Sequence, residues 1–350
     1  MDTLYEKLVR PTLFKMDPED AHRRGVRALS LLGSTGPLVG ALREWNRLKA
    51  DKPVRCLGLE FPNAVGVAAG MDKDGECVRG FEALGYGHVE VGTVTPKAQP
   101  GNDRPRLFRY PEAHAIINRM GFNNAGAEAL AKRLSKSCPK AKRKVVVGVN
   151  IGKGRTTPLD RAPDDYLECF RTLVHEADYF TVNVSSPNTA NLRQLQEREH
   201  LEAILGAVQQ ENLARGEAKV PLLVKIAPDL TFRQIDTLLE VVMAAQCDGV
   251  IATNTTIARS GAFASVKEDG GLSGRPLAHR STKLINYIYK STEGRLPIIG
   301  VGGIEDAHTA GEKIDAGASL IQVYTSMIFR GPFIGRTLAR ALRARQRRWI

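Results

Sequence analysis

Eight short apolar runs alternate with helical patterns after Pro53, and this alternation constrains the fold of the 350-residue chain more than any other feature. Most of the runs are continuous stretches of Val, Ile and Ala, which are typical of parallel strands buried on both faces. We expect the strands at residues 64–69, 88–93, 145–150, 179–184, 222–226, 249–253, 297–301 and 319–323. Helical patterns between them, such as residues 201–211 and 232–245, would complete βα units.

Eight βα units in a chain of this length predict an α/β fold, a closed (β/α)8 TIM barrel. A doubly wound open sheet is the alternative, but no G-x-G-x-x-G sequence opens the first unit. Before the first barrel strand, VRCLGLEFPN predicts a small hairpin with Gly58 in its turn. The connection from Pro96 to Gly126 is unusually long, and such insertions tend to build the mouth of an active site.

We expect residues 1–48 to form a small N-terminal helical extension and residues 49–350 to form the barrel. Asp17-Pro18-Glu19-Asp20 suits a helix start, because Asp17 can cap, Pro18 fits the first position and the acids favour the positive end. Gly33 to Pro37 should end the helical pair. Each helix carries one apolar stripe, formed by Tyr5, Leu8, Val9, Thr12 and Leu13 and by Ala21, Gly25, Ala28, Leu29 and Leu32. The stripes either pack on the barrel or partly face a membrane interface.

Composition narrows the functional classes. No apolar run approaches the roughly 20 residues of a membrane-spanning helix, and the early acids argue against a secretory signal. The five cysteines are far apart and never in C-x-x-C spacing, so we expect neither a zinc site nor a disulfide framework. The net charge of +12 comes largely from seven Lys/Arg in residues 132–144 and six Arg in residues 336–348. These runs could bind anionic lipid or nucleic acid or be solvated helix faces, but no zinc-finger or RNA-binding signature supports nucleic acid.

Polar residues follow every predicted strand, at the end of a barrel where chemistry takes place. They lie in residues 69–73, 93–96, 150–152, 183–189, 225, 253–256, 302–304 and 324–325. Lysine is rarely buried without a partner, so Lys225 indicates an anionic or electron-rich ligand unless a buried acid neutralises it. There is no His cluster and no carboxylate pair among them, which disfavours a metal site and glycoside hydrolysis.

The remaining amides, hydroxyls and cations suit a planar, polar heterocycle and a phosphate. Gly302-Gly303 after the seventh strand and Tyr324-Thr325 after the eighth lie where barrels commonly bind a phosphate. Glycine allows the backbone to approach such a group closely.

These residues lie in sequence motifs by which the chain resembles the quinone-dependent class of the dihydroorotate dehydrogenases. The matching motifs run in the family's order through almost the whole chain: GVAAGMDKDGE (66–76), EVGTVTPKAQPGNDRPRLFR (90–109), INRMGFNNAG (117–126), GVNIGK (148–153), VNVSSPNT (182–189), VKIAPDL (224–230), ATNTT (252–256), GGLSGRPL (270–277), GVGGI (300–304) and QVYTSMIFRGP (322–332). VNVSSPNT and INRMGFNNAG are highly specific in combination. Gly154 departs from relatives that often carry Asn there, and we attach no functional consequence to it.

The resemblance implies that FMN oxidises (S)-dihydroorotate to orotate in pyrimidine biosynthesis and that a membrane quinone is the final acceptor. It implies FMN contacts from Ala69, Gly70, Met71, Asp72, Lys73, Thr93, Asn150, Asn183, Lys225, Thr253, Gly274, Gly303, Tyr324 and Thr325. It implies substrate contacts from Lys73, Asn118, Arg119, Met120, Gly121, Phe122, Asn183, Asn188, Asn254 and Thr255.

The resemblance also assigns Ser186 as the catalytic base, where the soluble class carries Cys. Without the resemblance, Ser186 is best explained as a turn hydroxyl before Pro187. By resemblance His22 and Arg109 lie along a quinone tunnel entered between the N-terminal helices, with Tyr324 near its inner end, although a lone helical histidine is usually exposed. We expect a monomer bound peripherally to the cytoplasmic face of a bacterial inner membrane.

Two rival functions remain open at this point. A soluble flavin dehydrogenase of the same barrel would use fumarate or NAD, and a Cys at position 186 with no N-terminal helices would favour it. A basic, non-enzymatic protein that binds nucleic acid or membrane would be colourless when purified.

Overall fold

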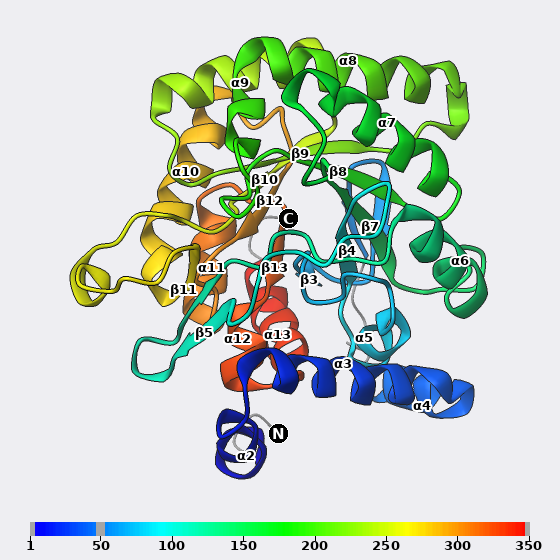
Figure 1. The fold of residues 1–350 in the computed structure, drawn as a ribbon. Coiled ribbons are helices and arrows are strands. Elements are labelled where there is room, and N and C mark those ends of the chain that lie inside the picture. The colour runs from blue at the N-terminus through cyan, green and yellow to red at the C-terminus, as the bar shows by residue number, and fades with distance from the viewer. Residues whose placement is uncertain (1–3, 47–52, 347–350) are drawn as a thin grey trace.

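The computed structural model describes residues 4–46 and 53–346, and its centre is a closed barrel of parallel strands (Figure 1). The strands pair in the order β10-β12-β13-β3-β4-β7-β8-β9. Their bounds are β3 Val65–Val67, β4 His88–Val94, β7 Val146–Ile151, β8 Tyr179–Asn183, β9 Leu222–Ile226, β10 Gly249–Ala252, β12 Ile298–Val301 and β13 Leu320–Val323. Each lies on a predicted apolar run, so the TIM barrel is confirmed and the open-sheet alternative is wrong.

Helices surround the barrel and follow its strands in turn. They are α5 Val78–Leu84, α6 Ala127–Ser137, α7 Ala162–Leu173, α8 Arg198–Ala214, α9 Phe232–Ala244, α10 Ala278–Ser291, α11 Ala307–Asp315, α12 Thr325–Arg330 and α13 Ile334–Gln346. In α8, Leu201, Ile204, Leu205 and Val208 are buried, which is the spacing of one helical face. The barrel strands are buried on both sides; all seven residues of β4 are covered.

The N-terminal segment contains more helix than predicted. It consists of a π-helical turn η1 (Tyr5–Val9), α2 (Arg10–Phe14), α3 (Pro18–Ser34) and α4 (Gly36–Asn46). The predicted cap is confirmed, because the Asp17 carboxylate accepts hydrogen bonds from the backbone N–H groups of Glu19 and Asp20 at 2.9 and 3.1 Å. The prediction that Gly33 to Pro37 ends the helical pair is confirmed, because α3 ends at Ser34. A further helix, α4, was not predicted; it begins at Gly36, and proline is well tolerated in its first turn. The expected boundary between residues 48 and 49 lies outside the described residues.

The helix α3 packs across one side of the barrel, next to α5 and β5 (Figure 1). Backbones approach closely there: a Cβ on Gly80 of α5 would lie 2.3 Å from the carbonyl oxygen of Leu29. The C-terminal helices α12 and α13 lie beside the same segment in Figure 1. Part of the N-terminal helical surface is therefore covered by the barrel.

Two small antiparallel sheets complete the fold. The predicted hairpin is confirmed as β1 (Val54–Cys56) and β2 (Leu59–Phe61), with left-handed φ at both Leu57 and Gly58. The long insertion forms β5 (Leu107–Tyr110) and β6 (Ala115–Asn118). A strand from a distant loop, β11 (Gly271–Gly274), joins β6 and makes a three-stranded sheet. This second sheet brings the insertion and the loop after β10 to the same cavity.

Candidate active site

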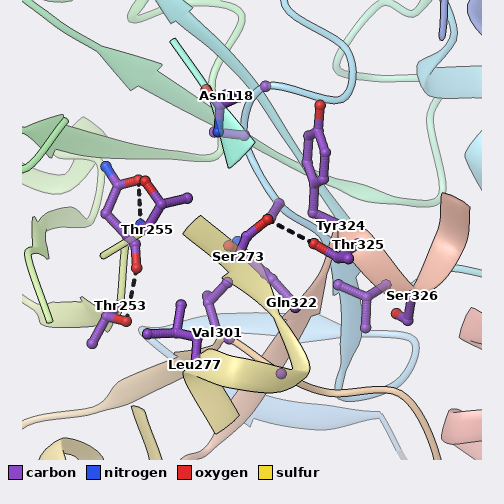
Figure 2. A pocket seen from close by; sticks show the side chains of 18 of the residues that line it. Asn118, Thr253, Thr255, Ser273, Leu277, Val301, Gln322, Tyr324, Thr325 and Ser326 are labelled. Carbon is purple, nitrogen blue, oxygen red and sulfur yellow. Dashed lines mark hydrogen bonds between the residues drawn. The ribbon is translucent and has the colours of Figure 1, made fainter. Parts of the chain in front are cut away.

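One cavity at the barrel mouth collects polar side chains from the ends of most strands (Figure 2). In Figure 2, Thr253 and Thr255 lie on one side of it, and Tyr324, Thr325 and Ser326 lie on the other. The predicted residues that line it are Ala69, Gly70, Lys73, Thr93, Asn118, Met120, Gly121, Phe122, Asn183, Ser186, Asn188, Lys225, Thr253, Asn254, Thr255, Gly274, Gly303, Tyr324 and Thr325. Residues from distant parts of the sequence therefore share a single site.

Four residues predicted to contact FMN or substrate lie outside this lining. Met71 lies instead on the wall of a second cavity, and Asn150 lies behind Thr93. The Arg119 guanidinium stacks over the Phe108 ring at 4.7 Å.

Asp72 is the fourth of these residues. It is fully buried, and its carboxylate accepts the N–H groups of Glu76 and Cys77 at 2.7 and 2.9 Å. Burial raises the pKa of this carboxyl. The sequence placed these residues near the site but could not give the direction of their side chains.

Asparagine side chains form a connected network on the cavity wall. The Asn183 amide donates to Thr93 Oγ1 at 2.8 Å and to Asn150 Oδ1 at 3.0 Å. The Asn254 amide donates in turn to Asn183 Oδ1 at 3.3 Å. Behind the wall, the buried Tyr166 hydroxyl donates to the Asn183 carbonyl at 2.8 Å and fixes the end of β8. The amides are thus oriented in advance, as recognition of a flat polar ring requires.

Ser186 is almost fully buried and is contacted by its own loop. Its Oγ accepts a hydrogen bond from the Asn188 backbone N–H at 3.2 Å. The Asn188 side chain donates to Asn118 Oδ1 at 3.1 Å, while its own Oδ1 is buried without a hydrogen-bond partner among the described residues. A donor on the Ser186 oxygen favours negative charge there, which a serine needs in order to accept a proton.

Lys225 lines the cavity and also has a buried acidic partner. Its Nζ lies 3.4 Å from Glu90 Oε1 on β4, so the alternative of a neutralising acid holds. Asn150 and Gln322 also donate to the Glu90 carboxylate, at 2.8 and 3.0 Å. Sequence reasoning missed Glu90, although a single acid inside the apolar run HVEVGTV was the available signal.

Lys73 and Tyr324 are half-buried titratable groups on the wall. Lys73 Nζ donates to the Gly70 carbonyl at 3.1 Å, and burial lowers the pKa of this lysine to about 8. Burial raises the pKa of the Tyr324 phenol to about 12, so it remains neutral near pH 7. Lys73 can therefore change charge within an accessible pH range, whereas Tyr324 cannot.

Where a phosphate was expected, hydroxyls and glycine backbone meet. Ser273 Oγ and Thr325 Oγ1 are 2.9 Å apart, as the dashed line in Figure 2 marks. Ser326 Oγ and Gln322 Oε1 are buried without a hydrogen-bond partner in the described part of the chain. The sequence prediction missed these lining residues: His114, Ser273, Arg275, Glu305, Gln322 and Ser326. Only Gln322, a polar residue inside an apolar strand, carried a sequence signal.

A second cavity of about 690 Å³ lies between the N-terminal helices and the barrel. Its lining is mostly apolar, drawn from Leu13, Phe14, Ala21, Val26, Leu29, Leu32, Leu107, Ile116, Met327, Ile328 and Phe333 among others. His22 and Arg109 both lie on its wall. Burial, together with the positive charge of Lys73, lowers the pKa of His22 to about 3. His22 is therefore neutral near pH 7, and it is half-buried rather than an exposed helical residue.

Comparison with known proteins gives a consistent result. A family model described as dihydroorotate dehydrogenase matches residues 53–345. A curated protein of Salinispora arenicola named dihydroorotate dehydrogenase (quinone) is 51% identical over 347 residues, covering 97% of this chain and 99% of the relative. One of Shewanella oneidensis with the same name is 47% identical, covering 97% and 99%. A crystal structure of DHODH from Eimeria tenella in complex with ferulenol superposes with a TM-score of 0.84 at 40% identity, covering 95% of this chain and 92% of that one.

Proposed function

The chain belongs to the dihydroorotate dehydrogenase family, and we propose that it oxidises (S)-dihydroorotate to orotate in pyrimidine biosynthesis. FMN would accept the hydride, and a membrane quinone would be the final electron acceptor. The observation that carries this proposal is the convergence of Lys73, Ser186 and Lys225 on one cavity at the barrel mouth. A proton acceptor and two cations around oriented amides suit an anionic pyrimidine next to a flavin.

The residues present fit FMN. Gln322 Oε1 and Ser326 Oγ are buried polar atoms that a ligand could satisfy, and they line the same cavity as the hydroxyls of Ser273 and Thr325. The FMN phosphate would lie near Gly303 and Thr325. When bound, FMN supplies the hydride-accepting chemistry, and the protein supplies orientation and electrostatics. Contacts from Met71 and Asp72 would come from their backbones, because their side chains point elsewhere.

The amide network would recognise the substrate ring. Asn118, Asn183 and Asn254 offer donors and acceptors to a pyrimidine, and Lys73 offers a cation to its carboxylate. Ser186 would remove the proton from C5 of dihydroorotate while its own hydroxyl proton passes to a neighbouring group or a water chain. The Asn188 N–H donor on its oxygen lowers the cost of negative charge while the proton moves.

Lys225 would favour negative charge on the cofactor side of the cavity. Its ammonium is buried, and an unpaired buried charge is costly. The Glu90 carboxylate at 3.4 Å offsets that cost and so keeps a cation on the cavity wall. Lys225 can therefore face a ligand as a cation even though a buried acid lies next to it.

The second cavity is our candidate for the quinone site. Its apolar lining suits a quinone ring and tail, and His22 and Arg109 would contact the ring oxygens. Arg109 is held in place by the Leu13 carbonyl at 3.1 Å and by the Phe14 ring 4.5 Å from its guanidinium carbon. A neutral His22 can donate one hydrogen bond without bringing a charge into an apolar pocket.

We infer that the N-terminal segment, residues 1–48, meets the membrane, while residues 49–350 form the catalytic unit. Six of the ten exposed large hydrophobic residues described in the chain lie on this segment: Leu4, Leu8, Val9, Leu31, Leu38 and Trp45. Exposed apolar residues gathered on one short segment suit contact with lipid. Among the described residues, no helix is both long and apolar enough to cross a bilayer. We propose peripheral attachment of a monomer at the cytoplasmic face of a bacterial inner membrane.

The two rival functions are less well supported. A fumarate- or NAD-linked enzyme would have no use for the apolar second cavity, and its class carries Cys at position 186. A nucleic-acid-binding role is weakened because Lys140 and Arg143 of the first basic run pair with Asp178 at 3.6 and 2.6 Å. In the second run, Arg347 and Arg348 lie outside the described residues.

The test is Ser186→Ala, measured by stopped-flow reduction of the bound flavin by dihydroorotate. We expect FMN to stay bound and reduction to slow by about 10² to 10⁴, the usual contribution of a general base. Ser186→Cys should retain part of the rate, because a thiol (pKa about 8.5) is the more acidic group. An unchanged rate in Ser186→Ala would refute the base assignment.

A further inference from the structure

Glu19 lies in the first turn of α3, where the sequence suggested only a favourable interaction with the helix dipole. The structure gives it a different environment, because the residue is 6% exposed and sits between two arginines. Arg106 donates to both carboxylate oxygens at 3.0 and 2.9 Å, and Arg104 donates at 2.7 Å. The hydrogen bond from Arg106 is the largest cause that lowers the pKa of Glu19, to about 2. A residue acting only on the helix dipole needs neither burial nor a bidentate partner.

Arg106 extends this contact into the loop before β5. Its Nη1 donates to the carbonyls of Pro100 and Asn102, both at 2.7 Å. The Asn102 side chain then donates to the carbonyls of Arg119 and Asn188, both at 3.0 Å. An unbroken series of hydrogen bonds thus runs from α3 to the backbone of two substrate-facing loops.

The second half of this series is tightly packed. A Cβ added to Gly121 would lie 2.7 Å from the Asn102 side chain, and one added to Gly101 would lie 2.3 Å from the Met120 carbonyl oxygen. Asn102 N also donates to the Met120 carbonyl at 3.0 Å. Because little free space separates these loops, a shift of Arg106 would be transmitted to the cavity wall.

We propose that Glu19 is a positioning residue for dihydroorotate binding: through Arg106 and Asn102 it holds the Asn188 loop and residues 118–122 in their binding geometry. This inference rests on the proposed function, since it concerns the substrate of the same cavity. Glu19 acts through other residues and does not touch the substrate. One turn along α3, His22 lines the second cavity, so the helix that forms the candidate quinone site also supports the substrate site.

The test compares Glu19→Gln with Asp20→Asn, a matched control that removes the neighbouring carboxylate of the same turn. Asp20 is more exposed, pairs with Arg23, and reaches Arg104 only at 3.6 Å. For Glu19→Gln we expect the dihydroorotate KM and the orotate Kd to rise about tenfold, as small misplacements of binding groups produce. The kcat at saturating dihydroorotate should change less than the KM, because Ser186 itself is kept and only its Asn188 N–H donor lies on the shifted loop. Orotate binding is measured by calorimetry, independently of turnover.

A third variant covers the case in which Glu19→Gln does not fold. Glu19→Asp keeps the charge and withdraws it by one methylene, and we expect a smaller rise in KM and Kd. The proposal would be overturned if the Glu19 variant that folds had the same KM and Kd as Asp20→Asn. Failure of the proposed function is distinguishable, because the unmodified protein would then not be reduced by dihydroorotate at all.

Discussion

The pair formed by Lys225 and Glu90 permits a quantitative prediction. At 3.4 Å and an effective dielectric constant of about 20, their attraction is about 5 kcal/mol. Removing one partner leaves the other charge buried and unpaired, which typically costs about 3–5 kcal/mol. We therefore expect Glu90→Gln and Lys225→Met each to destabilise the protein strongly, and the double variant to lose much less than the sum.

The assay is thermal unfolding of the flavin-free protein, so that loss of cofactor does not enter the comparison. At about 2 °C per kcal/mol for a large domain, each single variant should lower Tm by roughly 6–10 °C. Asn150 and Gln322 also donate to Glu90, and an amide at that position can still accept from one of them. Strictly additive losses in the double variant would refute the view that Glu90 is present to balance the Lys225 charge.

Three further predictions follow from the two cavities. Removing residues 1–48 should abolish reduction of a long-chain quinone but spare flavin reduction at saturating dihydroorotate. Full quinone activity of the truncated protein in a steady-state assay would count against the second cavity as the quinone site. Gly303→Ala should lower the flavin content per chain, because the φ of Gly303 is +68° and a Cβ there would lie 2.4 Å from Ala278. Gly206→Ala serves as the control, because a Cβ at Gly206 would have nothing within 4 Å. Equal flavin absorbance in both variants would contradict this prediction. Lys73 has a pKa of about 8 and is cationic only below it, so kcat/KM for the anionic substrate should fall as pH rises through 8. If a Lys73→Gln variant shows the same fall of kcat/KM with pH, the titration of Lys73 is not its cause.

Sequence patterns were sufficient for the barrel but not for everything attached to it. Continuous Val/Ile/Ala runs predict parallel strands because burial on both faces requires them. The strand β11 was missed because it carries two glycines in four residues and pairs along its length with β6, more than 150 residues earlier in the chain. The helix α4 was missed because Gly36-Pro37 suggested a turn, although proline also suits a first helical turn.

For the candidate site, the sequence predicts the chemical type of each residue and the strand that it follows. Lys73, Ser186 and Lys225 stand at strand ends and share the cavity as expected. The roles of Glu19 and Glu90 could not be predicted, because each depends on partners that only the folded chain brings near. Glu90 and Gln322, for example, are 232 residues apart in sequence. Likewise, a motif gives the position of Met71 but not which of the two cavities its side chain faces.

The central claim is that a single flavin bound at the barrel mouth takes electrons from dihydroorotate. Anaerobic titration of the purified protein, followed by visible absorbance, measures this most directly. We predict a yellow protein whose flavin bands disappear as one equivalent of dihydroorotate per chain is added and return when a quinone is supplied. A colourless protein that does not take up FMN, or a bound flavin that dihydroorotate leaves oxidised, would contradict the account.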